Sequence, residues 1–200
     1  MIAFDHIAVV AATLEAGADH VRRGLRVEVG PGGTHALMGT HNRLCGLGDD
    51  QYLEVIAIDP DVAGPGRPRW FDLDRREGPP RIGNWIARTA DLDTLVARYP
   101  QAGRPVSFKR GNLRWRMALP DDGILPFDGC FPALIEWQSA PPSFPETGMR
   151  LASLILHHPE APRLADVLSG LIDDPRIRIE TGPAALEAEI VTPGGMRRLA

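Results

Sequence analysis

The sequence predicts an α+β protein in which tandem βαβββ modules form a curved mixed sheet around a cleft. Two observations predict it. The chain of 200 residues contains 21 glycines and 19 prolines and few long helical patterns, which favours strands and turns. The order strand, helix and three strands also occurs twice, in residues 1–60 and 81–140, with a connector at 61–80. A shortened βαββ segment at 141–200 completes one compact unit.

The first module begins with an apolar strand that carries a polar Asp5-His6 pair near its start. Thr13 can cap the helix that follows, because its hydroxyl can accept a hydrogen bond from the first turn. The remaining elements are a brief strand at 26–29 and a hairpin of strands at 40–47 and 52–58, with a turn at Gly48-Asp49-Asp50.

The connector is rich in proline and glycine, with a helical turn expected around residues 70–73. The second module then repeats the first. Its predicted elements are a strand at 82–89, a helix capped by Asp91, and strands at 105–109, 112–119 and 133–137.

The third segment repeats the order in shorter form. Its predicted elements are a strand at 149–156, a helix at 162–171, strands at 177–180 and 185–191, and a final edge at 194–199. We expect these strands to extend the same sheet.

Composition excludes several classes of protein. The net charge of −4 with both signs interspersed does not indicate a nucleic-acid or membrane surface. No apolar run approaches the roughly 20 residues that span a bilayer, and no secretory signal is visible. Two cysteines, Cys45 and Cys130, suggest a reducing compartment, so the expected location is cytoplasmic.

Glu54 breaks the apolar pattern of its strand, Tyr-Leu-Glu-Val-Ile. A carboxylate there needs water, a partner or an ion, because an uncompensated buried charge is very costly. If this strand lies beside the first strand, Glu54 and His6 can point into one concave face, either to bind a metal ion or to form a hydrogen-bonded pair. Glu136, in the matching strand of the second module, is the natural third ligand of an oxygen-rich metal set.

Other residues are candidates for substrate binding, each with a structural alternative. His41 and Asn42 can line the pocket or only fix the hairpin. Arg114 and Arg116 share a strand face and can clamp an acidic group or face solvent. Trp85 can form a pocket wall or fill the core, and His157-His158 can simply end a strand.

Several of these segments resemble the glyoxalase-like domain family of the vicinal oxygen chelate superfamily, which includes glyoxalase, bleomycin resistance proteins and extradiol dioxygenases. The resemblance covers residues 2 to about 140 and lies in these stretches: Phe4-Asp5-His6-Ile7-Ala8-Val9, Gly39-Thr40-His41-Asn42, Tyr52-Leu53-Glu54, Gly83-Asn84-Trp85-Ile86-Ala87, Leu113-Arg114-Trp115-Arg116 and Leu134-Ile135-Glu136-Trp137. It implies metal ligands His6, Glu54 and Glu136. The place of the usual fourth ligand holds Asn84-Trp85.

The resemblance implies a metal-dependent lyase, isomerase or dioxygenase that acts on a small oxygenated metabolite. The ion would be divalent Mn, Fe, Ni, Co or Zn, and Glu54 or Glu136 could serve as general base. The alternative is a metal-free protein that binds or sequesters a small molecule, as bleomycin resistance proteins do. Such modules often pair edge to edge, so a homodimer is one expected form.

Overall fold

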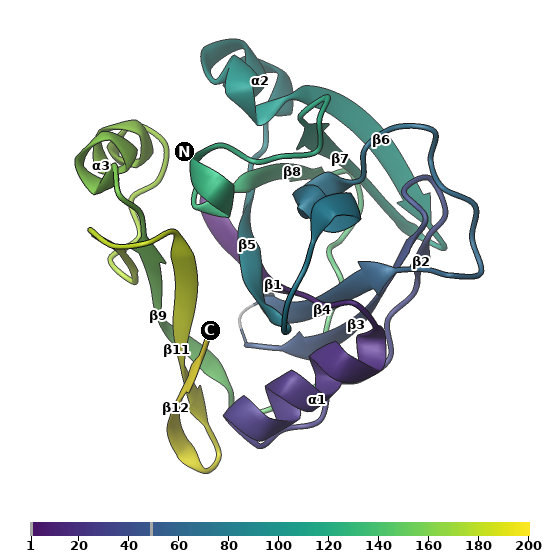
Figure 1. Cartoon of the computed structure of the whole chain (residues 1–200), viewed down its shortest axis with the longest axis vertical. Coiled ribbons are helices and arrows are strands. Elements are labelled where there is room, and N and C mark those ends of the chain that lie inside the picture. The colour runs from purple at the N-terminus through teal and green to yellow at the C-terminus, as the bar shows by residue number, and fades with distance from the viewer. Residues whose placement is uncertain (1, 49) are drawn as a thin grey trace.

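The computed structural model describes residues 2–48 and 50–200 and confirms the α+β class. An eight-stranded sheet of order β2-β3-β4-β1-β5-β8-β7-β6 curves until it is nearly closed (Figure 1). Its strands are β1 (Ala3–Val10), β2 (Thr34–His35), β3 (Thr40–Gly46), β4 (Tyr52–Ile58), β5 (Arg81–Arg88), β6 (Arg104–Arg110), β7 (Leu113–Leu119) and β8 (Ala133–Trp137). Asp49, in the predicted hairpin turn, lies outside the described residues.

The same strand pairing occurs in both predicted modules. The first strand pairs in parallel with the fourth, β1 with β4 and β5 with β8, and the modules join through antiparallel pairing of β1 with β5. Ala8 in the centre of β1 consequently lies beside Glu54 on one side and Asn84 on the other. This row of three residues crosses the join between the modules.

Both predicted helix caps of the modules are confirmed. The Thr13 hydroxyl accepts a hydrogen bond from the Ala16 amide at 3.2 Å at the start of α1 (Leu14–Leu25). The Asp91 carboxylate accepts one from the Thr94 amide at 3.0 Å at the start of α2 (Leu92–Arg98). Each cap satisfies an amide that has no partner within its helix.

The predicted strand at 26–29 was wrong. Arg26 adopts a left-handed conformation, with φ of 57°, and its amide bonds the Arg22 carbonyl to end α1. The chain then makes an isolated bridge from Gly30 to Leu44 of β3, and regular strand pairing begins only at β2. Proline cannot donate to a strand ladder, so the pairing at Gly30 does not continue through Pro31.

The predicted helical turn of the connector is present as η1 (Trp70–Arg75), a short 3₁₀ helix. Trp70 and Leu73 are buried inside the curved sheet, so the connector fills part of the space that the sheet encloses (Figure 1). Phe71 and Asp72 have φ of 61° and 55°, a region that costs L-residues roughly 1–2 kcal/mol each. The other 3₁₀ turns are η2 (Pro100–Ala102) and η3 (Phe127–Gly129).

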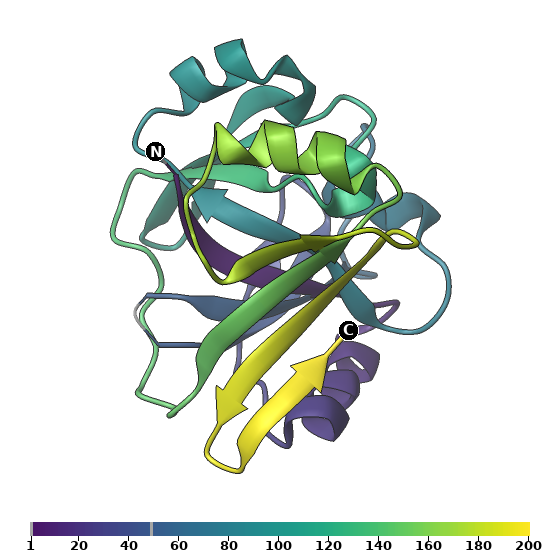
Figure 2. The ribbon, with the colours of Figure 1, turned by 90° about the vertical axis from the view of Figure 1, so that its left-hand side faces the viewer.

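The third segment forms a sheet of its own, and the expectation that it extends the first sheet was wrong. Its elements are β9 (Arg150–His157), α3 (Ala161–Ser169), β10 (Ile177–Glu180), β11 (Ala185–Thr192) and β12 (Gly195–Leu199). The strand order is β10-β9-β11-β12, so the first strand is central and has no free edge for the large sheet. Figure 2 shows this sheet and α3 in front of the large one.

The curved sheet therefore separates two apolar cores. The outer core lies between its convex face, the helices and the second sheet, and it includes Trp85, Leu154 and Leu164. The inner core lies within the curve and includes Trp70 and Trp115. Side chains that alternate along β1, β4, β5, β7 and β8 consequently point into different cores.

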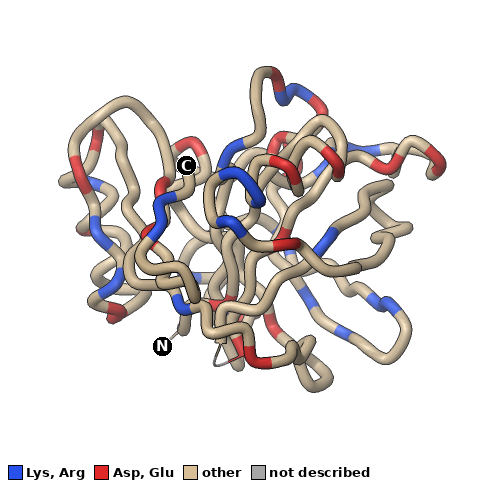
Figure 3. The backbone as a smooth tube through the Cα atoms, turned by 90° about the horizontal axis from the view of Figure 1, so that it is seen from below, with Lys and Arg blue, Asp and Glu red and all other residues tan. Residues whose placement is uncertain are grey.

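Acidic and basic residues are interspersed along the whole backbone (Figure 3). Among residues 2–48 and 50–200, none of the helices has the length and apolar character required to cross a membrane.

Candidate functional site

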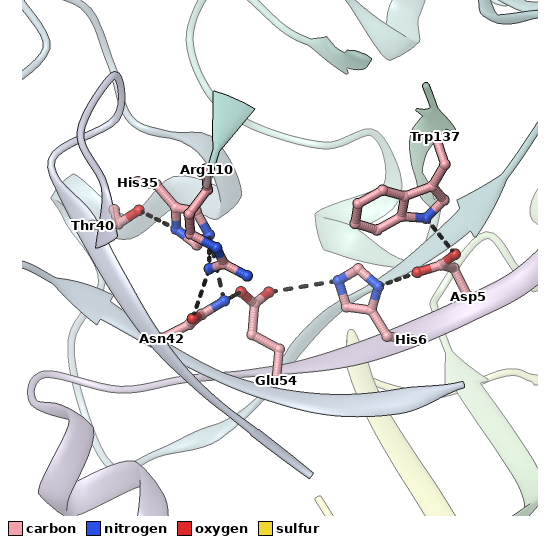
Figure 4. A network of polar contacts seen from close by, with 8 residues as sticks. All are labelled: Asp5, His6, His35, Thr40, Asn42, Glu54, Arg110 and Trp137. Carbon is pink, nitrogen blue, oxygen red and sulfur yellow. Dashed lines mark hydrogen bonds and ion pairs between the residues drawn. The ribbon is translucent and has the colours of Figure 1, made fainter. Parts of the chain in front are cut away.

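A buried pair of ionisable groups lies within the curve of the sheet, on adjacent strands. His6 Nε2 of β1 lies 3.6 Å from Glu54 Oε2 of β4, and both side chains are at most 7% exposed (Figure 4). Asn42 of β3 donates a hydrogen bond from Nδ2 to Glu54 Oε1 at 2.6 Å. His6 and Glu54 thus face one another as predicted, and Asn42 of the hairpin also reaches Glu54.

A second carboxylate fixes the orientation of His6. Asp5 Oδ1 accepts a hydrogen bond from His6 Nδ1 at 2.6 Å, which leaves Nε2 to face Glu54. Asp5 Oδ2 accepts a hydrogen bond from Trp137 Nε1 at 3.0 Å and lies 3.3 Å from Arg88 Nε. A register shift between Phe4 and His6 interrupts the strand ladder here, and such irregularities redirect side chains.

The other end of the pair is held from the second module. Arg110, at the end of β6, donates from Nη1 to Asn42 Oδ1 at 3.0 Å and to His35 Nε2 at 3.1 Å. His35 Nδ1 in turn donates to Thr40 Oγ1 at 3.1 Å. The contacts form one network from Asp5 to Arg110 (Figure 4).

The network sets the charge states of the pair. Burial alone would raise the pKa of Glu54, but the hydrogen bond and charge of His6, with His35 and Asn42, lower that pKa to about 2. Burial alone would lower the pKa of His6, and the hydrogen bonds and charges of Asp5 and Glu54 outweigh burial and raise it. Both shifts favour the ionised pair, a Glu54 carboxylate facing a protonated His6 imidazole.

His35 is opposite in character. Burial lowers its pKa from 6.5 to about 4; the charge of Glu54 opposes this shift and the charge of Arg110 adds to it. In this network His35 is a neutral ring that accepts a hydrogen bond from a permanent cation.

This difference makes folding stability sensitive to acid. Between pH 6.5 and 4 His35 takes up a proton in the unfolded chain but not in the native protein. The free energy of unfolding therefore falls as the pH falls, and the pKa shift of His35 accounts for about 3 kcal/mol of this fall. We expect His35→Gln to remove most of this loss, as measured by urea unfolding at pH 6.5 and at pH 4. His20→Gln on α1 is the matched control and should keep the wild-type slope; an unchanged slope in His35→Gln would contradict the prediction.

The space beside the pair is small and has aromatic walls. A cavity of about 30 Å³ is lined by His6 and Glu54 and by the rings of Trp70, Trp115 and Trp137. This volume holds roughly one water molecule. Trp70 and Phe71 of the connector form part of this wall.

The structure does not bring Glu136 into this group. Its neighbours Ile135 and Trp137 line the cleft, and since side chains alternate along a strand, Glu136 points to the outer face. There Glu136 Oε2 accepts a hydrogen bond from Arg116 Nη1 at 3.0 Å. Arg116 also binds Asp93 of α2 at 2.5 Å, and Arg114 is exposed on the same outer face.

The remaining predicted residues also lie away from the pair. Trp85 is fully buried in the outer core and donates from Nε1 to the Cys130 carbonyl at 2.9 Å. His41 Nδ1 lies 3.8 Å from Asp59. The imidazoles of His157 and His158 face carboxylates elsewhere: Glu180 and Glu187 for His157, and Asp128 for His158.

The donor set beside the pair does not fit a protein-bound catalytic metal ion. Such an ion generally takes three protein ligands. The cleft offers His6, Glu54 and His35, and the free nitrogen of His35, Nε2, already accepts a hydrogen bond from Arg110. The described residues contain no group of three His, Cys, Asp or Glu side chains arranged to hold an ion. Asn84, at the place of the fourth expected ligand, faces the inner side of β5 but lines a different cavity.

Sequence reasoning missed His35, Arg110 and Trp70 as members of the site. His35 and Trp70 lie in loop-rich stretches without a periodic pattern, and Arg110 precedes the β6–β7 turn. Asp5 carried a signal, because it adjoins His6 in an apolar strand. A second charged residue in such a strand indicates a partner for the first.

Comparisons with known proteins agree with this architecture. A family profile described as a glyoxalase-like domain matches residues 4–172. A hypothetical protein from Staphylococcus aureus has a similar fold, with a TM-score of 0.65, 12% identity and coverage of 100% of this chain and 99% of that chain. No curated protein matches the sequence.

Two further solved structures are more distant. A methylmalonyl-CoA epimerase from Mycobacterium tuberculosis is 19% identical, with a TM-score of 0.45 over 70% of this chain and 89% of that chain. A hypothetical protein from Bacillus halodurans is 10% identical, with a TM-score of 0.45 over 72% of this chain and 99% of that chain. From the family match, the chain belongs to the glyoxalase-like domain family of the vicinal oxygen chelate superfamily.

Proposed function

We propose that this protein is an isomerase-type enzyme that moves a proton on a small carbonyl compound, with His6 and Glu54 as its acid–base pair. The observation that carries the proposal is the buried contact of His6 Nε2 with Glu54 Oε2 at 3.6 Å. A mid-strand carboxylate with its own oriented imidazole is costly to bury and contributes little to packing. Function explains such a pair better than folding does.

The pair has the protonation states that enolisation requires. The Glu54 carboxylate can remove the proton from the carbon next to a carbonyl group, while His6 donates its Nε2 hydrogen to the carbonyl oxygen. The electrons of the broken C–H bond then form the enol double bond. In the enediol of a hydroxyketone, Glu54 returns the proton either to the same carbon or to the former carbonyl carbon. The hydroxyl on the carbon that becomes the carbonyl gives its proton back to His6 in either case. The first route restores the substrate and the second yields its isomer.

Asp5 and Asn42 are positioning residues for this chemistry. Asp5 holds the His6 ring by Nδ1 and stabilises its positive charge, as a carboxylate behind a catalytic imidazole does. Asn42 holds one oxygen of Glu54, so the other oxygen faces His6 and the cleft. None of the proposed steps uses a bound metal ion.

Solvent-exchange NMR tests the proposal. Wild-type protein in D₂O should catalyse exchange of the carbon-bound hydrogen in at least one member of a panel of small 2-oxo acids, hydroxyketones and acyl thioesters. The same samples, purified without chelator, should give the same rate before and after EDTA treatment. Exchange that disappears with EDTA and returns with Mn, Fe, Ni, Co or Zn would replace this mechanism with a metal-dependent one.

A metal-free binding protein is the second candidate, favoured by the aromatic walls of the cleft. Trp115 and Trp137 have ring centroids 5.7 Å apart and lie beside the pair. Flat aromatic ligands could stack on them. Quenching of tryptophan fluorescence by such compounds, without any exchange of their hydrogens, would favour this candidate over the enzyme.

A further inference from the structure

A second cavity shares the connector residue Phe71 with the cavity beside the His6–Glu54 pair. Its volume is about 170 Å³, and Phe71 lines both cavities and stands between them. Its lining includes Asn84 of β5, which is buried, and Arg76 and Arg81, which are partly or fully exposed; we call the first the floor and the second the mouth. This space is larger than one or two water molecules require.

Asn84 at the floor of this cavity has no hydrogen-bond partner. The residue is 1% exposed, and neither its Oδ1 nor its Nδ2 contacts a donor or acceptor in the described structure. A buried amide left in this way typically costs about 1–3 kcal/mol for each unsatisfied group, and native proteins rarely tolerate it. A carboxamide presents a donor and an acceptor side by side, so its natural partner is a ligand that both accepts and donates.

The mouth of the cavity carries positive charge without a carboxylate partner. Within the described part of the chain, neither Arg76 nor Arg81 forms an ion pair; they donate to the backbone carbonyls of Gly78, Pro79 and Glu77. Arg76 Nε is buried and has no partner. Burial and then the charge of Arg81 lower the pKa of Arg76, which indicates that the two guanidinium groups repel each other.

The acidic residues around the cavity do not compensate these arginines. Asp72 pairs with Arg75 at 2.7 Å, and Asp128 lies 3.3 Å from His158. The Glu77 side chain is exposed and reaches neither guanidinium within ion-pair distance. An anion at the mouth would relieve the repulsion and give Arg76 and Arg81 the charged acceptor that arginine prefers.

We propose that this cavity binds a small carboxylic acid that also carries a hydroxyl or amide group. The carboxylate lies at the mouth against Arg76 and Arg81. The hydroxyl or amide group reaches Asn84 at the floor, where it accepts from Nδ2 and donates to Oδ1. The site is separate from the His6–Glu54 pair and does not require the proposed proton transfer.

Calorimetric titration of the full chain with glycolate, lactate and malate, with acetate for comparison, tests the site. We expect the hydroxy acids to bind saturably and more tightly than acetate. Arg76→Gln or Arg81→Gln should weaken binding of every acid by roughly tenfold or more, as loss of a charge-assisted hydrogen bond does. Asn84→Leu should remove the preference for hydroxy acids over acetate.

Controls separate this site from others. Arg23→Gln, an exposed arginine of α1, and Glu54→Gln in the first cleft should bind the acids as wild type does. Asn84→Leu should fold, because it replaces two unsatisfied polar atoms with apolar ones. Absence of saturable binding to wild type, as for a cavity that holds only water, would overturn the proposal, as would equal affinities in wild type, Arg76→Gln and Asn84→Leu.

Discussion

Replacement of Glu54 by Gln is expected to reduce hydrogen exchange at the substrate carbon at least 100-fold. A positioned general base contributes typically 10²- to 10⁴-fold, and the amide of Gln has almost the same shape but cannot accept the proton. The substitution also removes a negative charge 3.6 Å from His6 Nε2, so the pKa of His6 should fall. Exchange rates and the His6 resonances in an NMR titration measure the two effects.

Glu136→Gln is the matched control for this experiment. Glu136 lies on β8, the fourth strand of the second module as β4 is of the first, but it points to the outer face and pairs with Arg116. Its substitution should leave exchange within about twofold of wild type. A large loss in Glu136→Gln with little effect in Glu54→Gln would contradict the assignment of the base.

The two glutamates show how far the sequence could determine the site. The sequence located both strands, and the structure confirms their bounds within a residue. The face of a side chain depends on strand register, however, and a shift of one residue reverses it. Beside Ile86 on β5, the partner on β8 is Ala133, which shares its face with Ile135 and not with Glu136.

The site residues of the first module were easier to predict, because the local sequence pattern of their strands marks them. His6 and Glu54 each interrupt an apolar strand, and this pattern indicates a buried polar contact at both positions. For Asn42 the sequence left two roles open, in the pocket or in the hairpin alone, and the structure shows its contact with Glu54. Arg110 and Trp70 could not be found in this way, because they meet the pair only through the closure of the sheet and the path of the connector.

The third segment shows a second limit. Its elements were predicted in the right order, and even the final edge at 194–199 is present as β12. Their pairing was not, since β9 lies between β10 and β11 and not at the end of the large sheet. Element order is a local property, whereas the choice of strand neighbours depends on which apolar faces remain uncovered after the modules have joined.

Replacement of Trp70 by Ala is expected to lower the free energy of unfolding by about 3–5 kcal/mol, the usual cost of truncating a buried Trp. The side chain is 4% exposed, and its ring packs against His35 and Phe108 with centroids 5.1 and 5.2 Å away. This packing must also offset the left-handed backbone of Phe71 and Asp72, which costs roughly 2–4 kcal/mol in total. Without Trp70 the connector should leave the cleft, as urea unfolding and hydrogen exchange of its amides would show.

The variant Trp70→Phe separates the contribution of ring packing from the cost of the buried indole N–H group. Trp70 Nε1 is buried without a hydrogen-bond partner, so Phe keeps an aromatic ring and removes an unsatisfied donor. We therefore expect a much smaller loss of stability than in Trp70→Ala. If Trp70 blocks access to His6 and Glu54, ligands should associate faster with Trp70→Ala than with either Trp70→Phe or wild type in stopped-flow measurements. Equal association rates would mean that Trp70 does not control access to His6 and Glu54. A loss of unfolding free energy below about 1 kcal/mol in Trp70→Ala would mean that the connector does not occupy the cleft in solution.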